Sequence, residues 1–333
     1  MKHLSYSVAI RTLGNTGEKY QHLLQSIQSQ TIQPEEIIVA IPVGFDLDYK
    51  LGNERIVRCE KGMTHQRVAS INASNSQYTL VVDDDLEFGP TMVEDLLAYM
   101  ADNDLNCCLP MSGNDVTAED MIIDLRYPLL TRIRSGFTGQ MFTSRRKSKY
   151  LDILTYSAGH KVFLKSNNLD TCYLCTTACF QCFLIETKFA KLAQYEDELW
   201  LDKGRLTSYA AFDEPVFFSK LKPYGLRMAY ALRVRYRHLD AKVGHLTKTR
   251  LEDKQTRYYA IARNRSIYWY RCIWGLSTKS WEKLQAILGG LYSFTNYTLF
   301  TIVINLLPKY WPAINALFLG YKDALAFIRQ EKK

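Results

Sequence analysis

Residues 78–85 join a buried-strand pattern to three adjacent carboxylates. The first five residues, Tyr-Thr-Leu-Val-Val, are β-branched and aliphatic, which is typical of a strand covered on both faces, and Asp83, Asp84 and Asp85 follow at once. Three neighbouring acids repel one another, and hard oxygen ligands at a strand end suit Mg²⁺ or Mn²⁺, which can in turn hold a diphosphate. The alternative is a solvated acidic turn, since Asp is common where strands end.

Strand and helix patterns alternate through the first hundred residues. Such a βαβ series predicts an α/β fold with a mostly parallel, Rossmann-like sheet and helices on both faces, in which ligands bind at the carboxyl ends of the strands. The acidic triplet falls at such an end. Thr91 and Glu94 have the spacing of a capping box at a helix start. Predicted strands cover residues 6–10, 36–41, 55–59 and 78–82, and predicted helices cover 20–27, 66–73 and 92–100.

The composition indicates a folded protein of the cytoplasm. Of 333 residues, 47% are hydrophobic and 23% are charged, which excludes wholesale disorder and allows one large domain or two smaller units. The first residues contain no apolar stretch followed by a small-residue cleavage site, so we expect no secretion. Eight cysteines in a chain of this length do not resemble a dense disulfide framework, which favours reduced thiols.

The net charge of +8 is concentrated in the last third of the chain. Residues 220–283 contain sixteen Lys and Arg against four Asp and Glu, interleaved with Tyr and Trp. Such a stretch should face an anionic partner: ligand phosphates, anionic lipid head groups or nucleic acid. No nucleic-acid-binding motif accompanies it, so we expect no nucleic-acid partner. A second basic cluster at 145–149 is interpreted as a solvated loop, with a membrane-surface contact as the alternative.

Residues 284–307 contain no charged residue and are long enough to span a bilayer. Frequent Gly, Ser, Thr and Asn make them a poor spanning helix, and Lys309, Tyr310 and Trp311 then add the basic and aromatic character of a membrane interface. We therefore predict a helix or helical hairpin lying in the surface of a membrane. A buried core helix or oligomer helix is the alternative.

Several spaced features of the first ninety residues occur together in one known family. They are Arg11-Thr12 at a strand end, Gln30-Thr31 before a run from Pro34 to Val39, Lys61-Gly62-Met63 leading to Arg67, and the acidic triplet. This segment resembles the nucleotide-sugar-binding half of the inverting family 2 glycosyltransferases, whose fold is called GT-A. In place of the Asp that usually ends the second strand and reads the nucleotide base, this chain has Ile41-Pro42-Val43, which leaves the base open.

The resemblance continues downstream and covers most of residues 5–275, most weakly between 103 and 168. The run 177–185 is similar to the strand before the acceptor site. Further on, the chain resembles bacterial members that build O-antigen or capsular polysaccharide. The matching features are Asp213-Glu214 with a helix running to Tyr224-Gly225, Tyr236-Arg237-His238, and Tyr258-Tyr259 followed by Arg263-Asn264-Arg265. The resemblance implies a GT-A domain over 1–245, with a donor half at 1–100 and an acceptor half at 101–245. The remaining region, 246–333, is predicted to be helical and, from its apolar and aromatic residues, to associate with a membrane surface.

The resemblance also implies a role for each matching residue. Glu214 falls where the family has its catalytic base, with Asp213 beside it, and the alternative is a helix start, where acids before a Pro such as Pro215 are also common. Asp85, with Asp83 and His238, would hold Mg²⁺ or Mn²⁺, and Asp83 or Asp84 would reach the ribose. An ordinary surface histidine is the alternative for His238, and a helix-surface arginine is the alternative for Arg67. The donor-binding residues that it implies are Arg11, Thr12, Arg67, Asp83 and Asp84.

Four cysteines, Cys172, Cys175, Cys179 and Cys182, have a spacing that could suggest zinc or an iron–sulfur cluster. Zinc ribbons separate their pairs more widely, and half of the run overlaps the expected acceptor strand. Buried thiols are the preferred interpretation.

Together these features predict an inverting, metal-dependent glycosyltransferase, peripheral on the inner face of the cell membrane. It would move a sugar from a nucleotide-diphosphate donor to a hydroxyl of a lipid-linked surface glycan. The alternatives are a catalytically silent glycan-binding or scaffold protein of the same fold, and a nucleotidyltransferase for which Gly14–Gly17 is only a poor phosphate loop.

Overall fold

The structure, a computed structural model, divides into two compact units that are described separately. Unit 1 comprises Met1–Ile123, Lys165–Asp197 and Lys220–Gly244, and unit 2 comprises Asp124–Leu164, Glu198–Ser219 and His245–Lys333. The domain boundaries at 100 and 245 stay predictions. The structure describes residues 4–113, 123–124, 150–154, 156, 158, 160–162, 165–166, 172–178, 180–206, 210–239 and 250–331.

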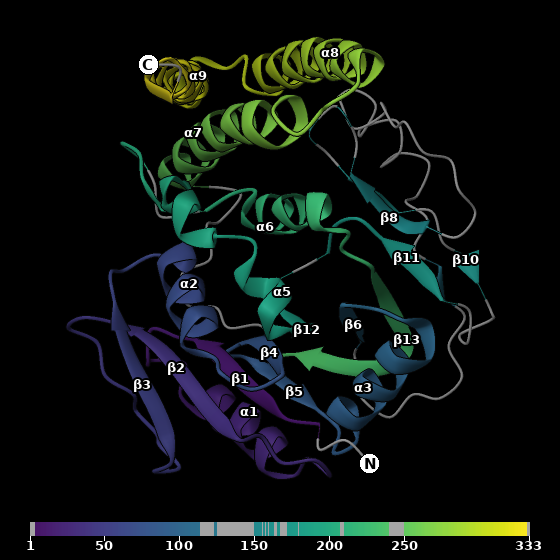
Figure 1. The fold of residues 1–333 in the computed structure, drawn as a ribbon. Helices are drawn as coiled ribbons and strands as arrows, with labels where there is room; N and C mark the ends of the chain where they lie inside the picture. The colour runs from purple at the N-terminus through teal and green to yellow at the C-terminus, as the bar shows by residue number, and fades with distance from the viewer. Residues whose placement is uncertain are drawn as a thin grey trace. The chain divides into compact units, whose positions relative to one another are not determined.

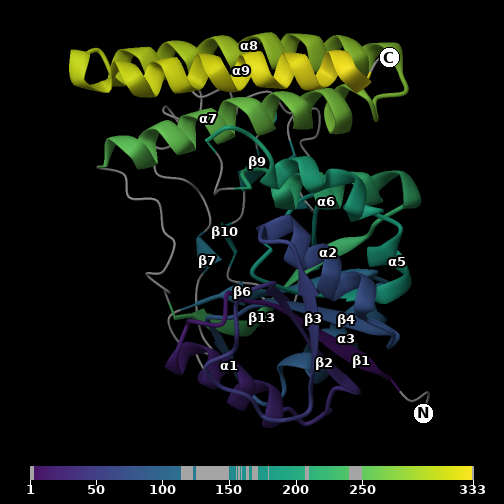
Figure 2. The ribbon, with the colours of Figure 1, turned by 90° about the vertical axis from the view of Figure 1, so that its left-hand side faces the viewer.

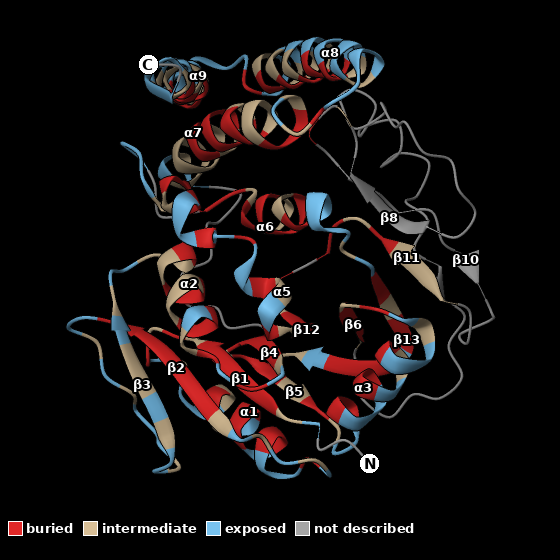
Figure 3. Cartoon of the chain, viewed as in Figure 1, coloured by how far each residue is buried: buried red, intermediate tan, exposed pale blue. Residues whose placement is uncertain are grey.

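The first half of unit 1 is the predicted βαβ series (Figure 1). Strand β1 lies between β2 and β4 and is parallel to both, and β3 extends the sheet beyond β2, also in parallel. These strands are almost wholly buried except for β3 at the edge (Figure 3), as their aliphatic sequences predict. The elements are β1 (Tyr6–Arg11), α1 (Glu18–Gln28), β2 (Glu36–Pro42), β3 (Glu54–Cys59), α2 (Met63–Ala73) and β4 (Tyr78–Asp83).

The second half of unit 1 continues the sheet with mixed strand directions. In unit 1 the strand order is β3-β2-β1-β4-β12-β6-β13-β11, and short β5 pairs with β13. Strand β12 is antiparallel to both β4 and β6, so the sheet is mostly but not wholly parallel, as expected. The elements are β5 (Leu86–Phe88), α3 (Met92–Asn103), β6 (Cys107–Ser112), β10 (Lys165–Ser166), β11 (Tyr173–Cys175), β12 (Cys182–Glu186), α5 (Thr187–Lys191) and β13 (Met228–His238).

Helices cover both faces of this sheet. Apolar residues of α1 and α3 join those of β1, β4 and β13 in one core cluster, in which Leu24, Leu96 and Val82 are fully buried. Helix α2 packs on β1, β2 and β3, and it also contacts α5. The amphipathic spacing of α1 and α3 therefore gives the layered arrangement that the sequence predicts.

Two local predictions need correction. Thr91 is the N-cap residue of α3, but the predicted capping box does not form. The Thr91 hydroxyl donates to the Asp95 carboxylate at 2.8 Å, and Glu94 accepts a hydrogen bond from Thr31 at 2.7 Å. The strand predicted within 177–185 begins only at Cys182. The weakly patterned region 103–168 contains β6 and also β7 (Ile123–Asp124), β8 (Tyr150–Leu154) and β9 (His160–Val162), while the basic cluster 145–149 lies outside the described residues.

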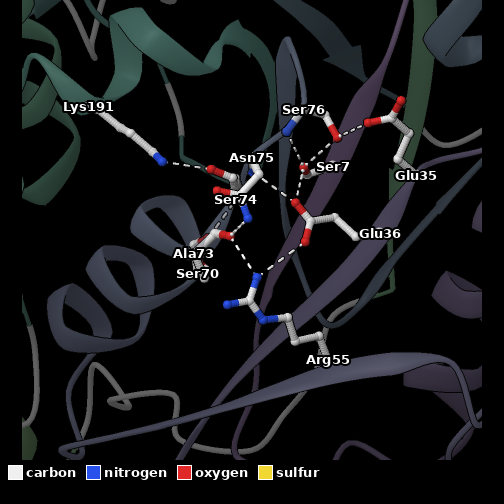
Figure 4. A network of polar contacts seen from close by, with 10 residues as sticks. All are labelled: Ser7, Glu35, Glu36, Arg55, Ser70, Ala73, Ser74, Asn75, Ser76 and Lys191. Carbon is white, nitrogen blue, oxygen red and sulfur yellow. Dashed lines mark hydrogen bonds and ion pairs between the residues drawn. The ribbon is translucent and has the colours of Figure 1, made fainter.

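A network of polar contacts lies at the amino ends of β1, β2 and β4 in unit 1 (Figure 4). Ser7 donates to Glu36 at 2.7 Å, and Ser76 donates to Glu35 at 2.8 Å. A cavity of about 350 Å³ lies beside it, lined by residues 74–77 and by 186–188 and 191. Tyr78 begins β4 at this edge and Asp83 ends it at the other, so the cavity is not part of the acidic site.

Unit 2 is built around three long helices (Figure 2). Helix α7 (Leu251–Tyr268) packs along α9 (Trp311–Glu331), and the π-helical turn η3 (Trp269–Trp274) contacts α8 (Ser280–Ile304). Unit 2 also includes all or most of three short helices: α6 (Asp213–Leu221) and the 3₁₀ helices η1 (Tyr195–Asp202) and η4 (Pro308–Tyr310). Of the described helices, α8 alone has the length and apolar composition to cross a membrane, a test that core helices also pass.

Candidate active site

Arg11 and Asp83 form the centre of the site in unit 1. They end two neighbouring parallel strands, and the register pairs them directly. Arg11 Nε and Nη2 each donate to a different Asp83 oxygen at 2.7 Å, which is the bidentate geometry of a strong ion pair. Burial by itself would lower the pKa of Arg11, but the charge of Asp83 and of the next two acids raises this pKa above its usual value. The Asp83 carboxylate is therefore engaged by a guanidinium.

Arg67 reaches the same carboxylate from α2. Its Nη2 lies 3.6 Å from Asp83 Oδ1, and its guanidinium carbon lies 4.2 Å from the centre of the Phe180 ring. The Arg67 side chain is only 3% exposed, which excludes the predicted alternative of a helix-surface arginine. Two arginines thus share one carboxylate, which places two positive charges beside the three acids at the carboxyl ends of β1 and β4.

Asp84 faces the loop that follows β1. Its Oδ2 accepts a hydrogen bond from Thr16 Oγ1 at 3.3 Å, and the Thr12 side chain also bonds to this carboxyl. Burial raises the pKa of Asp84 to about 6, even though the Thr12 hydrogen bond and the Arg11 charge act in the opposite direction. Asp84 is therefore ionised at neutral pH and protonated in mild acid.

Asp85 and His238 meet because β13 returns along β5. The antiparallel register places His238 opposite Leu86, and Leu239 N donates to the Asp85 carbonyl at 2.8 Å. His238 Nε2 consequently lies 3.2 Å from Asp85 Oδ2, and the two side chains are 19% and 9% exposed. The predicted surface alternative for His238 is wrong, since its ring is largely enclosed beside a carboxylate.

The three predicted metal ligands differ in how well they fit a divalent ion. A carboxylate oxygen and an imidazole nitrogen, as in Asp85 and His238, are ligands that Mn²⁺ or Mg²⁺ can accept. Asp83 differs from these two, because each of its oxygens already accepts a hydrogen bond from Arg11. Across the described part of the chain, no group of three or more His, Cys, Asp or Glu side chains is gathered as a metal centre.

Asp213 and Glu214 belong to unit 2, where they open α6. Asp213 is 3% exposed, whereas Glu214 is partly exposed. Phe212, which precedes them, has a φ of 73° and stacks its ring on Tyr268 at 5.6 Å between centroids. The helix start predicted as the alternative is therefore present, and of the two acids Glu214 is the more accessible to an acceptor hydroxyl.

The cysteine run lies largely in the core of unit 1. Cys182 and Cys175 are buried, and Cys172 packs against the apolar cluster, whereas Cys179 lies outside the described residues. Burial raises the pKa of the Cys182 thiol, and nearby Asp83 raises it further. The thiolate form that binds metals is therefore disfavoured at this position.

Three residues that contact or support the site were missed by the sequence reasoning. Phe180 provides the ring beneath Arg67, Thr16 donates to Asp84, and Gln66 Nε2 donates to the Thr12 carbonyl at 2.7 Å. Gln66 could have been noticed as a polar residue next to Arg67 in a helix that packs on the sheet. Nothing in the sequence distinguishes Phe180 from an ordinary core aromatic.

Comparison with known proteins gives one family match. Residues 49–168 match the model of "Glycosyl transferase family 2", a segment that includes Arg67 and the acidic triplet but neither Glu214 nor His238. No curated protein sequence matches the chain.

Solved structures of similar fold are distant. S. aureus TarS 1-349 is 15% identical with a TM-score of 0.43 over 98% of this chain and 92% of that chain, and its complex with UDP-GlcNAc is 12% identical with a TM-score of 0.44 over the same shares. GalNAc-T7 with UDP, GalNAc and Mn²⁺ is 14% identical with a TM-score of 0.49 over 92% of this chain and 58% of that chain. Likeness this remote does not define a function, so the family match carries the assignment. The family match, which includes the acidic triplet at the end of β4, thus identifies residues 49–168 as similar in sequence to the family 2 glycosyltransferases.

Proposed function

We propose that the protein is an inverting, divalent-metal-dependent glycosyltransferase that moves a sugar from a nucleotide-diphosphate donor to a hydroxyl of a lipid-linked surface glycan. The observation that carries this proposal is the approach of His238 to Asp85 at 3.2 Å, within an acidic turn that the family match covers. Both side chains lie at the carboxyl ends of parallel strands, where ligands bind in sheets of this kind.

The donor side consists of groups with separate tasks. Because Arg11 occupies both oxygens of Asp83, Asp84 is the acid left to accept a hydrogen bond from the ribose. Arg11 and Arg67 are held in place by Asp83, and their guanidinium groups would offset part of the charge of the diphosphate. Thr12 and Thr16 hold Asp84 in place through their hydroxyls.

Asp85 and His238 would hold the divalent ion, with donor phosphate oxygens and water completing its ligands. A bound ion of this kind neutralises charge that develops on the departing diphosphate. Asp83, by contrast, keeps Arg11 and Arg67 oriented.

The acceptor side needs a carboxylate that takes a proton from the attacking hydroxyl. Glu214 is the candidate because it is the more accessible of the two acids that begin α6. Asp213, buried beside it, would fix the start of the helix.

The decisive experiment measures hydrolysis and binding of nucleotide sugars by the purified full chain. UDP-, GDP- and dTDP-sugars are screened for stabilisation against heat with and without Mn²⁺, because a ligand that binds only the native state raises the melting temperature. Asp85→Ala should abolish metal-dependent stabilisation and hydrolysis, whereas Asp46→Ala, which changes an exposed acid paired with Arg58, should retain both. Donor binding without any hydrolysis or transfer would support the silent scaffold instead.

A further inference from the structure

Helix α8 exposes a continuous apolar stripe. Successive members are three or four residues apart, which places them on one side of the helix. Their exposure runs from 47% at Leu288 to 62% at Leu291, and only Thr295 interrupts the apolar series. The stripe consists of Trp281, Leu284, Leu288, Leu291, Thr295, Leu299 and Val303.

The opposite side of α8 is fitted against protein. Trp269 Nε1 donates to the Ala286 carbonyl at 2.9 Å, and a Cβ added at Gly290 would lie 2.7 Å from the same nitrogen. Near the other end, the Asn305 amide donates to Tyr258 Oη at 3.2 Å. Gly290 of α8 and Asn305 just after it, two of the residues that make this segment a poor spanning helix, therefore face the rest of unit 2. A helix that packs against protein on one side and exposes apolar residues on the other is suited to lie flat on an apolar surface.

The apolar surface continues onto α9. Figure 2 shows α8 and α9 next to each other on the same side of α7, and Leu306 and Leu307, both largely exposed, join them. Trp311, Phe318 and Leu325 are about half exposed or more along α9. We call the exposed apolar residues of α8, the linker and α9 the α8–α9 face.

Cations and indoles border this face at the two ends of α8. Lys279 and Lys283 stand with Trp281 at its start, and Lys309 stands with Trp311 just beyond its end. No charged residue occurs between them, from 284 to 308. Amphipathic Trp side chains and lysines around an apolar strip are suited to the region between lipid head groups and acyl chains.

We infer that the α8–α9 face lies in the plane of a membrane surface that contains anionic lipids, with its leucines in the acyl region and its lysines at the phosphates. A second copy of the chain fits less well, because a two-fold contact places the same patch of both copies together and so brings their lysines close. The inference rests on the proposed function, since it gives a soluble donor site access to a lipid-linked acceptor.

The test is co-sedimentation of the full chain with phosphatidylcholine vesicles, with and without phosphatidylglycerol. Leu288→Glu with Leu291→Glu should lower binding to the mixed vesicles at least about tenfold, because charges replace two exposed leucines that would enter the acyl region. Leu192→Glu with Leu206→Glu adds the same charge at exposed leucines outside α8 and should bind like the wild type. Lys279→Gln with Lys283→Gln should weaken binding only to vesicles that contain phosphatidylglycerol.

A second measurement does not depend on the folding of the glutamate variants. Brominated lipids should quench part of the wild-type Trp fluorescence, and Trp281→Phe with Trp311→Phe should remove that quenching. Equal vesicle binding by the Leu288/Leu291 variant and the wild type would overturn the inference. So would resistance of the bound protein to alkaline carbonate, which indicates spanning, or a wild-type dimer that this variant converts to a monomer without any vesicle binding.

Hydrolysis of the donor in solution, measured on the same variants, separates this inference from the proposed function. The Leu288/Leu291 variant should hydrolyse donor at the wild-type rate while failing to bind vesicles. Vesicle binding by a wild-type protein that binds no nucleotide sugar would contradict the proposed function but support the α8–α9 face as a membrane-binding surface.

Discussion

Arg11 and Asp83 share two parallel hydrogen bonds of 2.7 Å at the ends of neighbouring strands. Of the three acids in the turn, the first is therefore a partner for arginine, the second titrates near pH 6, and the third stands beside His238. One sequence motif thus contains three chemically distinct carboxylates, and each can be tested separately.

Removing the guanidinium from this pair should destabilise unit 1. Arg11→Ala removes both short hydrogen bonds from a carboxylate that is 9% exposed and leaves the longer contact to Arg67, so we expect the free energy of unfolding to fall by about 2 kcal/mol. Urea denaturation measures this change. Arg58→Ala, which breaks an exposed ion pair with Asp46, should alter it by less than about 1 kcal/mol. Equal effects of the two variants would contradict the proposed role of Arg11.

Asp84 should give the protein a specific dependence of stability on pH. Its pKa is 3.8 when unfolded and about 6 when folded, so the native state binds the proton more tightly and loses stability as the pH rises through this range. The difference in unfolding free energy between wild type and Asp84→Asn should change by about 2 kcal/mol between pH 4 and 7, with the wild type relatively weaker at pH 7. Denaturation in the presence of EDTA measures it. A difference that does not vary with pH would show that Asp84 has an ordinary pKa.

Glu214→Gln should separate donor binding from transfer. The amide keeps the size of the side chain but cannot accept a proton, so we expect transfer to fall by about two to four orders of magnitude while thermal stabilisation by the donor persists. Glu252→Gln, at an exposed acid on α7, serves as the matched control and should leave both unchanged. Wild-type turnover by Glu214→Gln would remove Glu214 from the mechanism.

Glu198 should be a main electrostatic support of unit 2. It is 1% exposed, accepts hydrogen bonds from Arg271 at 2.7 and 3.1 Å, and also accepts one from Trp200 Nε1 at 2.5 Å. Glu198→Ala leaves Arg271 without its buried partner and should lower the free energy of unfolding by about 3 kcal/mol. Calorimetry of this variant beside Glu252→Ala, whose ion pair is exposed, would show whether burial sets the size of the effect.

Contacts around Trp200 also explain the Arg263-Asn264-Arg265 motif, which the sequence could only associate with a family. Arg263 Nη1 donates to the Trp200 carbonyl at 2.9 Å, and the Asn264 amide donates to the carbonyls of Leu201 and Ala211. These residues connect α7 to the chain before α6. Their spacing in the sequence indicates a helix, but it does not identify the carbonyls that they bind.

Local periodicity determined the layered half of this protein. Apart from the short strand β5, the strands and helices of residues 6–103 follow from aliphatic runs and amphipathic spacing, because each pattern can bury its apolar side in only one kind of layer. The position of Asp83–Asp85 at the carboxyl edge follows from the same rule. Tertiary structure alone decided that β13 returns beside β5 to bring His238 to Asp85, and that Asp83 turns to Arg11 and Arg67. Those contacts join residues far apart in the chain, and a carboxylate takes its pKa and its partner from the neighbours that folding gives it.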